Sequence, residues 1–166
     1  MSFVKRILSD IHVADPIYCL GGAVVMAALG FVTLLSSDCH PMYRILLLPR
    51  GALPYFAFAM LSIALLALIG LAGGLLFALP GCRQRGWSVL LLLVALAILV
   101  FAWFHVLFRQ MALFWALLIM IAILALEVFV IIKTYLEYVL SCMAAILSLL
   151  ISLHLCWLNL GLWFLN

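Results

Sequence analysis

Three ionisable side chains lie inside long apolar runs of the sequence: Glu127, His105 and His154. A carboxyl or imidazole group at such a depth is costly in a membrane, so it indicates a functional site by default. Either histidine could ligate a haem iron or hydrogen-bond a propionate. Glu127 lies six residues before Lys133, about 9 Å along a helix, and could instead reach the interface or pair with a neighbouring helix. A histidine in a helix bundle could equally bond a backbone carbonyl or a serine, so these structural alternatives stay open.

Other patterns that indicate catalysis or metal binding are absent from the sequence. The five cysteines are scattered without a Cys-x-x-Cys pair, which favours small apolar helix residues over a zinc or redox site. There is no recognisable catalytic triad, no Gly-rich phosphate loop and no cluster of metal ligands. The net charge of +3, without a dense basic cluster, argues against nucleic acid as a partner. We therefore expect no catalytic residue and no metal site, and a protein that is more plausibly not an enzyme.

The composition places these side chains in a membrane protein. Hydrophobic residues make up 72% of the chain and charged residues 8%, against roughly half and a quarter in soluble domains. The lipid bilayer is therefore the expected partner of a multi-pass protein. At the N-terminus, residues 3–12 have apolar side chains at helical spacing, which predicts a short interfacial helix. A solvated turn is the alternative.

The apolar runs predict a single domain, residues 1–166, with five spans. The run from 87 to 132 is 46 residues long, about 69 Å as one helix, whereas a hydrocarbon core is about 30 Å thick. We therefore expect it to reverse at Arg109-Gln110. The predicted spans are residues 17–35, 54–79, 87–108, 111–132 and 138–164. Backbone polar groups must be satisfied inside lipid, so the predicted fold class is an all-α five-helix transmembrane bundle. Lysines and arginines divide five against three between the two sides, which favours a cytoplasmic N-terminus.

The predicted loop at residues 36–53, with the start of the next span, holds three of the five prolines, yet its middle is apolar. Pro49 would end a short turn, Gly51 would permit a reversal and Pro54 would lie in the first turn of the second span. An apolar loop has reason to fold over the mouth of a bundle, so we interpret it as a lid with Tyr43 and residues 46–48 facing inward. The alternative is an interfacial connector with no ligand beneath it.

A run of residues in this loop and the next span keeps the order and spacing of one known family: Tyr43, Leu46, Pro49, Pro54, Phe58 and Gly70. It resembles the TspO/MBR family, the tryptophan-rich sensory and translocator proteins of the peripheral benzodiazepine receptor group. LNLGLWFLN, residues 158–166, is similar to the family's closing Leu-Asn-x-x-x-Trp-x-x-Asn. FAWFHVLF, residues 101–108, is similar to the Trp-x-x-x-Phe-Phe of its third helix. Gly51 and Ser62 stand where the family carries tryptophan, so the chain resembles a divergent member.

The resemblance implies a membrane receptor or carrier that binds a flat hydrophobic ligand, such as a porphyrin, within the helix bundle and beneath the lid. The ligand-binding residues that it implies are Tyr43, Pro49, Phe58, Ser62, Leu66, Trp103, Leu107 and His154. It implies a porphyrin or haem as ligand and no other certain cofactor. It also implies a homodimer that forms through glycine-rich helix faces. Close packing of helices within the monomer explains the glycines equally well.

We expect a bacterial cell membrane rather than an organelle membrane. The alternative function is a non-enzymatic structural or accessory subunit of a larger membrane complex, which the scarcity of polar core residues favours. An enzyme acting on porphyrins is the least expected, because the pocket tryptophans are replaced.

Overall fold

The computed structural model describes residues 16–37, 39–78, 86–135 and 139–166. Within these ranges the chain is all-α, without a strand. The elements are α2 (Pro16–Ser36), α3 (Cys39–Ile45), α4 (Tyr55–Ala78), α6 (Trp87–Phe104), a π-helical turn η1 (His105–Arg109), α7 (Leu113–Thr134) and α8 (Val139–Leu165). The predicted interfacial helix at residues 3–12 lies outside the described residues.

Five of the described helices are long and apolar enough to cross a membrane: Pro16–Ser36, Tyr55–Ala78, Trp87–Arg109, Leu113–Thr134 and Val139–Leu165. Each end differs from the predicted span by no more than two residues. Their lengths of 21 to 27 residues meet the requirement of about 20 residues for a hydrocarbon core. The predicted multi-pass, five-helix bundle is confirmed.

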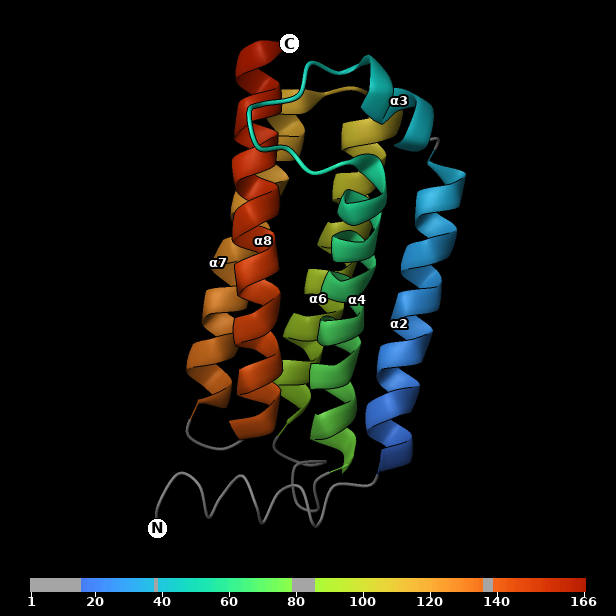
Figure 1. Cartoon of the computed structure of the whole chain (residues 1–166). Helices are drawn as coiled ribbons and strands as arrows, with labels where there is room; N and C mark the ends of the chain where they lie inside the picture. The colour runs from blue at the N-terminus through green and yellow to red at the C-terminus, as the bar shows by residue number, and fades with distance from the viewer. Residues whose placement is uncertain (1–15, 38, 79–85, 136–138) are drawn as a thin grey trace.

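Helices that are neighbours in space are not always neighbours in sequence, as α4 and α8 show (Figure 1). The helix α2 packs on α4, α4 on α8, α8 on α7 and α7 on α6, while α6 also contacts α4 and α2. Only 11% of the α2 segment is buried, against 50% of the α4 segment. The helix α4 is therefore central, and α2 is peripheral with most of its surface facing lipid.

Glycines set the close approach of α2 to α4. A Cβ atom built on Gly22 would collide with the Gly70 carbonyl oxygen, and one built on Gly74 would collide with the Tyr18 carbonyl oxygen. Small residues of this kind let helix backbones come together in membranes. Three of the glycines that sequence reasoning singled out are thus used within the monomer.

The predicted reversal between the third and fourth spans lies at residues 109–112. The last turn of the third span widens into η1, where Gln110 N–H donates to the His105 carbonyl oxygen (3.2 Å). Met111 then takes a φ of 54°, a left-handed conformation that is uncommon outside glycine. The chain restarts as α7 at Leu113, so the hairpin predicted at Arg109-Gln110 is confirmed.

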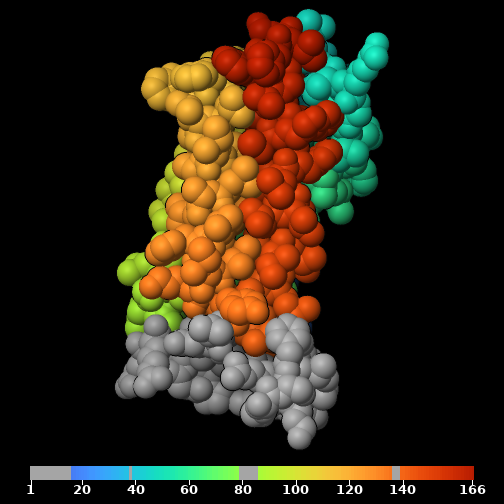
Figure 2. All heavy atoms as spheres, turned by 90° about the vertical axis from the view of Figure 1, so that its left-hand side faces the viewer, coloured from blue at the N-terminus to red at the C-terminus, as the bar shows by residue number. Residues whose placement is uncertain are grey.

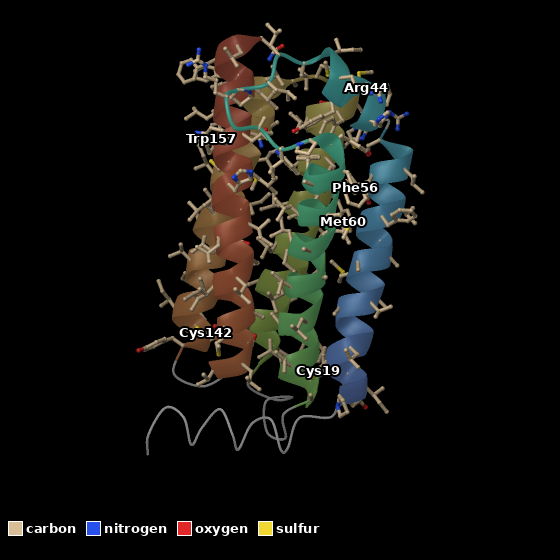
Figure 3. The ribbon with its side chains drawn as sticks, viewed as in Figure 1. Cys19, Arg44, Phe56, Met60, Cys142 and Trp157 are labelled. Carbon is tan, nitrogen blue, oxygen red and sulfur yellow. The ribbon has the colours of Figure 1, made fainter. Side chains whose placement is uncertain are left out.

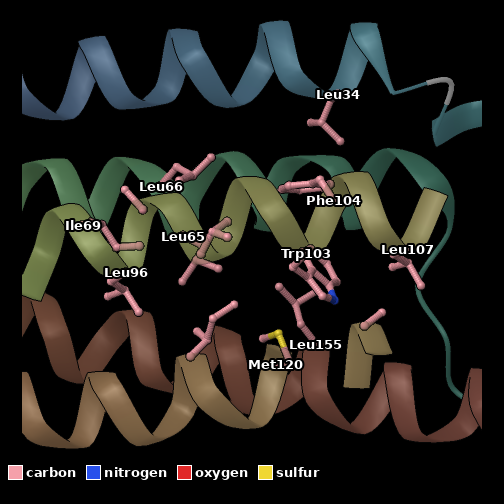
Figure 4. Packing of buried hydrophobic residues seen from close by; sticks show 14 of the residues in the cluster. Leu34, Leu65, Leu66, Ile69, Leu96, Trp103, Phe104, Leu107, Met120 and Leu155 are labelled. Atoms are coloured by element: carbon pink, nitrogen blue, oxygen red, sulfur yellow. The ribbon is translucent and has the colours of Figure 1, made fainter. Parts of the chain in front are cut away.

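The interior is filled by apolar side chains of α4, α6, α7 and α8. In Figure 4 the Phe104 ring lies beside α4, and the Trp103 ring lies deeper in the bundle with Leu155 and Met120 beside it. All four side chains are fully buried. Figure 2 shows α7 and α8 lying side by side along one face of the bundle.

Candidate functional site

A connecting segment crosses one end of the bundle, and we name residues 46–54 the strap. The chain leaves α3, passes over to α8 and returns to begin α4 (Figure 1). The strap is fixed at its outer point by Asn166, whose Oδ1 accepts from Leu47 N–H (3.0 Å) and whose Nδ2 donates to the Leu47 carbonyl oxygen (3.1 Å). These two hydrogen bonds join the strap to the end of the last helix.

Two further contacts and a reversal of the backbone shape the strap. A Cβ atom built on Gly161 would lie 2.6 Å from Pro49, so the proline ring rests on the glycine of α8. Gly51 reverses the chain with a φ of 86°, as expected for a residue without a Cβ atom. Tyr43 Oη donates to the Leu53 carbonyl oxygen (2.7 Å). Burial raises the pKa of the Tyr43 phenol above its usual value of 10.0.

Two expectations about the lid are wrong. The predicted loop at residues 36–53 contains a helix of seven residues, α3. Leu46 is buried as expected, but Leu47 and Leu48 are 63% and 40% exposed and do not face inward. An apolar side chain at a lipid boundary gains nothing by pointing into the protein, because lipid solvates it as well.

Beneath the strap lies a cluster of aromatic rings. Tyr43 of α3 stacks on Phe58 of α4 with centroids 5.1 Å apart, and Phe58 meets Trp103 of α6 at 6.3 Å. Phe108 packs edge-on against Phe58 at 5.6 Å, and Phe104 lies 4.7 Å from Trp103. The structure brings together three predicted lining residues, and adds two phenylalanines to which sequence reasoning gave no lining role.

The other predicted lining residues divide into two groups. Leu107 is fully buried in η1 beside this cluster, and Pro49 is half-buried above it on Gly161. Leu66 points instead toward α2, where its Cδ1 lies 2.7 Å from a Cβ atom built on Gly30. Ser62 is fully buried, and its hydroxyl donates to the Phe58 carbonyl oxygen (2.9 Å), so its polar atom is satisfied within α4.

Three buried polar atoms at this end of the bundle have no hydrogen-bond partner among the described residues: Trp103 Nε1, His154 Nε2 and Asn159 Oδ1. Trp103 is fully buried and Asn159 is 1% exposed. Asn159 Nδ2 donates to the Leu155 carbonyl oxygen (2.9 Å), and Figure 4 shows Trp103 beside Leu155. The indole N–H of Trp103 and the amide oxygen of Asn159 therefore lie at the same end of the bundle interior.

Sequence reasoning did not assign a role to Asn159, although it lies within the C-terminal stretch that carried the resemblance. The ring of His154 lies 5.8 Å from that of Trp157, and Figure 3 places Trp157 on α8 at the level of the strap, far from Cys142. His105 is exposed on η1. Of the two histidines considered as ligands, only His154 therefore presents a buried, unpaired nitrogen.

Exposed cations surround this end of the bundle. Arg44 lies in the last turn of α3, Arg50 lies in the strap and Arg109 ends η1, and all three are exposed. Within the described residues no group of three or more His, Cys, Asp or Glu side chains could hold a metal ion. The site therefore offers aromatic faces, a few buried polar atoms and a positive rim.

A separate apolar groove of about 360 Å³ lies between α2, α4 and α6. Its lining includes Gly22, Met26, Gly73 and Leu93, and none of the eight predicted ligand-binding residues borders it. Sequence reasoning did not find this groove, which lies beside the glycine contacts of α2 with α4. The predicted site and the open groove are thus different places.

Comparison with known proteins assigns no family to this arrangement. No known family model matches the chain, and no curated protein matches it.

Proposed function

We propose that the chain is a membrane receptor or carrier for a flat hydrophobic ligand such as a porphyrin, bound beneath the strap. The observation that carries the proposal is the unpaired indole N–H of Trp103 together with the unpaired oxygen of Asn159. Leaving a buried polar group without a partner costs about 1–3 kcal/mol, and nearly all such groups in proteins are paired. A ligand with polar edges would recover that free energy.

The surrounding side chains favour a flat ligand. Phe58 and Trp103 offer ring faces for stacking, and a mostly apolar lining with few polar groups is typical of small-molecule sites. The exposed guanidinium groups of Arg44 and Arg50 suit carboxylate substituents, which they bind in pairs of parallel hydrogen bonds. Porphyrins that carry propionates combine these two features.

Ligand entry requires the strap to move, because the aromatic rings contact one another. The attachments of the strap are the pair of hydrogen bonds to Asn166, the Tyr43–Leu53 hydrogen bond and the packing of Pro49 on Gly161. Each hydrogen bond contributes about 0.5–1.5 kcal/mol. Breaking all three hydrogen bonds to admit a ligand would therefore reduce its net binding free energy by about 1.5–4.5 kcal/mol.

The proposal includes membership of the TspO/MBR family as a divergent member in a bacterial cell membrane. The support is the combination of five spans, a strap at the expected loop and a C-terminal helix that ends in contact with that strap. Asn159 and Asn166, which lie in the stretch similar to the family's closing motif, contribute polar atoms to this site together with His154 of α8.

A second function is favoured by a different observation. The rings beneath the strap are already packed against one another, and large apolar side chains cover the outside of every spanning helix. An accessory subunit of a larger membrane complex, without a ligand of its own, needs only these features.

Titration of the purified protein in nanodiscs with protoporphyrin, followed by ligand absorbance, separates the two functions. We expect saturable binding that Trp103→Phe weakens about tenfold, because the substitution removes the indole N–H and keeps an aromatic ring. Trp115→Phe is the control, since Trp115 is 62% exposed and lies on α7 away from the site. Uptake that never saturates, as in empty nanodiscs, would favour the accessory subunit.

A further inference from the structure

Glu127 is a buried ionisable side chain that has no role in the proposed ligand site. It lies on α7 with no exposed surface, facing α8. Its Oε1 accepts hydrogen bonds from Ser148 Oγ (2.8 Å) and Ser152 Oγ (3.0 Å), two residues one turn apart on α8. Of the two structural alternatives open from sequence, Glu127 therefore pairs with a neighbouring helix rather than reaching the interface.

The second carboxyl oxygen, Oε2, is buried and has no hydrogen-bond partner among the described residues. The hydroxyl groups of Ser148 and Ser152 are neutral, and both contact Oε1 and not Oε2. An ionised carboxyl would thus be a buried charge that no cation among the described residues contacts. Such a charge is strongly unfavourable in a low-dielectric interior, and proton binding removes it.

The ionisable groups on the neighbouring elements do not supply the missing charge. The elements packed on α7 are α8, α6 and η1, and together with α7 they carry the following: Lys133, Cys142, His154, Cys156, His105 and Arg109. Across the described ranges none of these contacts the carboxyl group, whose partners are the two serines alone. Cys142 Sγ lies 4.0 Å from the Ile131 carbonyl oxygen instead.

The hydroxyl of Ser148 has two acceptors for its single proton. Its Oγ lies 2.8 Å from Glu127 Oε1 and 3.0 Å from the Ala145 carbonyl oxygen. With an ionised carboxyl, both serines donate to Oε1. With a protonated carboxyl, Oε1–H donates to Ser148 Oγ while Ser148 donates to Ala145. The same heavy-atom positions therefore accommodate both protonation states.

We propose that Glu127, Ser148 and Ser152 form a proton-binding site at the α7–α8 interface. A proton from water binds a Glu127 carboxyl oxygen and is released again to water, and no other bond is made or broken. Glu127 lies seven residues before the end of α7 at Thr134, about 10 Å along the helix, so the exchange takes place at membrane depth.

Infrared difference spectroscopy on the full chain in lipid tests this directly. We expect the C=O band of a protonated carboxyl, its shift after transfer to D2O, and its reversible loss on alkaline titration. Glu127→Gln, which keeps the size of the side chain, removes the band. Ser148→Ala and Ser152→Ala bind the proton about threefold to tenfold more tightly, because the hydrogen bond that each loses is stronger to the charged carboxylate than to the neutral carboxyl.

Ser141→Ala is the matched control, because Ser141 is a buried serine of α8 whose hydroxyl donates to the Ala72 carbonyl oxygen (3.1 Å) and not to Glu127. It leaves the titration of the band unchanged. A band that is absent at every pH, or one that persists throughout the titration, would overturn the proposal. If Glu127→Gln does not fold, the titration of the wild type and of the serine variants still decides between these outcomes.

Discussion

Leu47 and Asn166 are joined by two hydrogen bonds although 119 positions separate them. Leu47 N–H donates to Asn166 Oδ1, and Asn166 Nδ2 donates back to the Leu47 carbonyl oxygen. The pair connects the outer point of the strap to the end of α8.

The first prediction concerns this pair. Asn166→Ala removes both hydrogen bonds and accelerates hydrogen exchange of the Leu47 amide by about fivefold to 150-fold, as the loss of two bonds worth about 0.5–1.5 kcal/mol each implies. Asn166→Asp keeps an oxygen that accepts from Leu47 N–H and retains most of the protection. Equal exchange rates in the wild type and Asn166→Ala would show that the pair does not hold the strap.

The second prediction concerns the packing of the strap on α8. Gly161→Ala places a methyl group 2.6 Å from Pro49, and overpacking of this kind costs about 1–3 kcal/mol. A proline ring cannot turn aside, so the strap itself must shift. Gly21→Ala is the control, because a Cβ atom there meets nothing within 4 Å. Reversible unfolding in detergent should show a loss of stability for Gly161→Ala alone, and equal stabilities would contradict the contact.

The third prediction concerns the α2–α4 contact. Gly70→Ala would place a methyl group against the Gly22 carbonyl oxygen and 2.7 Å from Met26 Cγ. Backbone atoms cannot yield, so α2 must move away from α4. Spin labels at the exposed positions Val32 and Phe56 should report a longer distance between the helices.

The control for this displacement is Gly73→Ala, three residues farther along α4. A Cβ atom on Gly73 would make only ordinary contacts, with its nearest neighbour at 3.9 Å. The distance between the labels should therefore match that of the wild type. A distance that Gly70→Ala leaves unchanged would mean that the two backbones are not in contact in the membrane.

The fourth prediction concerns pH. Because burial raises the pKa of Tyr43 above 10.0, the neutral phenol is favoured in the folded state. Its contribution to stability is complete below the ordinary pKa and is lost as the pH rises through the raised value. Tyr43→Phe is less stable at neutral pH by about 1 kcal/mol, since the hydrogen bond to Leu53 is gone. The difference in melting temperature between the two proteins should shrink toward alkaline pH, and a constant difference would contradict the assignment.

The five spans could be predicted because composition and length alone decide whether a segment fits a membrane. The reversal near Arg109 could be predicted for the same reason. The helix α3 was missed because Pro41 was interpreted as part of a loop. The proline is the third residue of that helix, a position in the first turn where no backbone N–H is needed.

The candidate site could be predicted only in part, because apolar periodicity does not distinguish a lipid-facing surface from an interior one. Leu66 was expected to line the ligand site but packs toward α2. Asn159 was missed, and the pairing of Glu127 stayed open, because both depend on the rotation of α8. One signal could have revealed that rotation, namely the helical spacing of the polar residues of α8: Ser141, Ser148, Ser152 and Asn159.

The most direct test of ligand binding beneath the strap uses Trp103 as the only tryptophan. The four others become phenylalanine: Trp87, Trp115, Trp157 and Trp163. In nanodiscs, protoporphyrin should quench Trp103 fluorescence saturably at one ligand per chain. A protein that keeps only Trp115, which faces lipid, should show quenching that follows partitioning into the bilayer without saturation. Quenching of Trp103 that rises in parallel with that of Trp115 and never saturates would contradict a site beneath the strap.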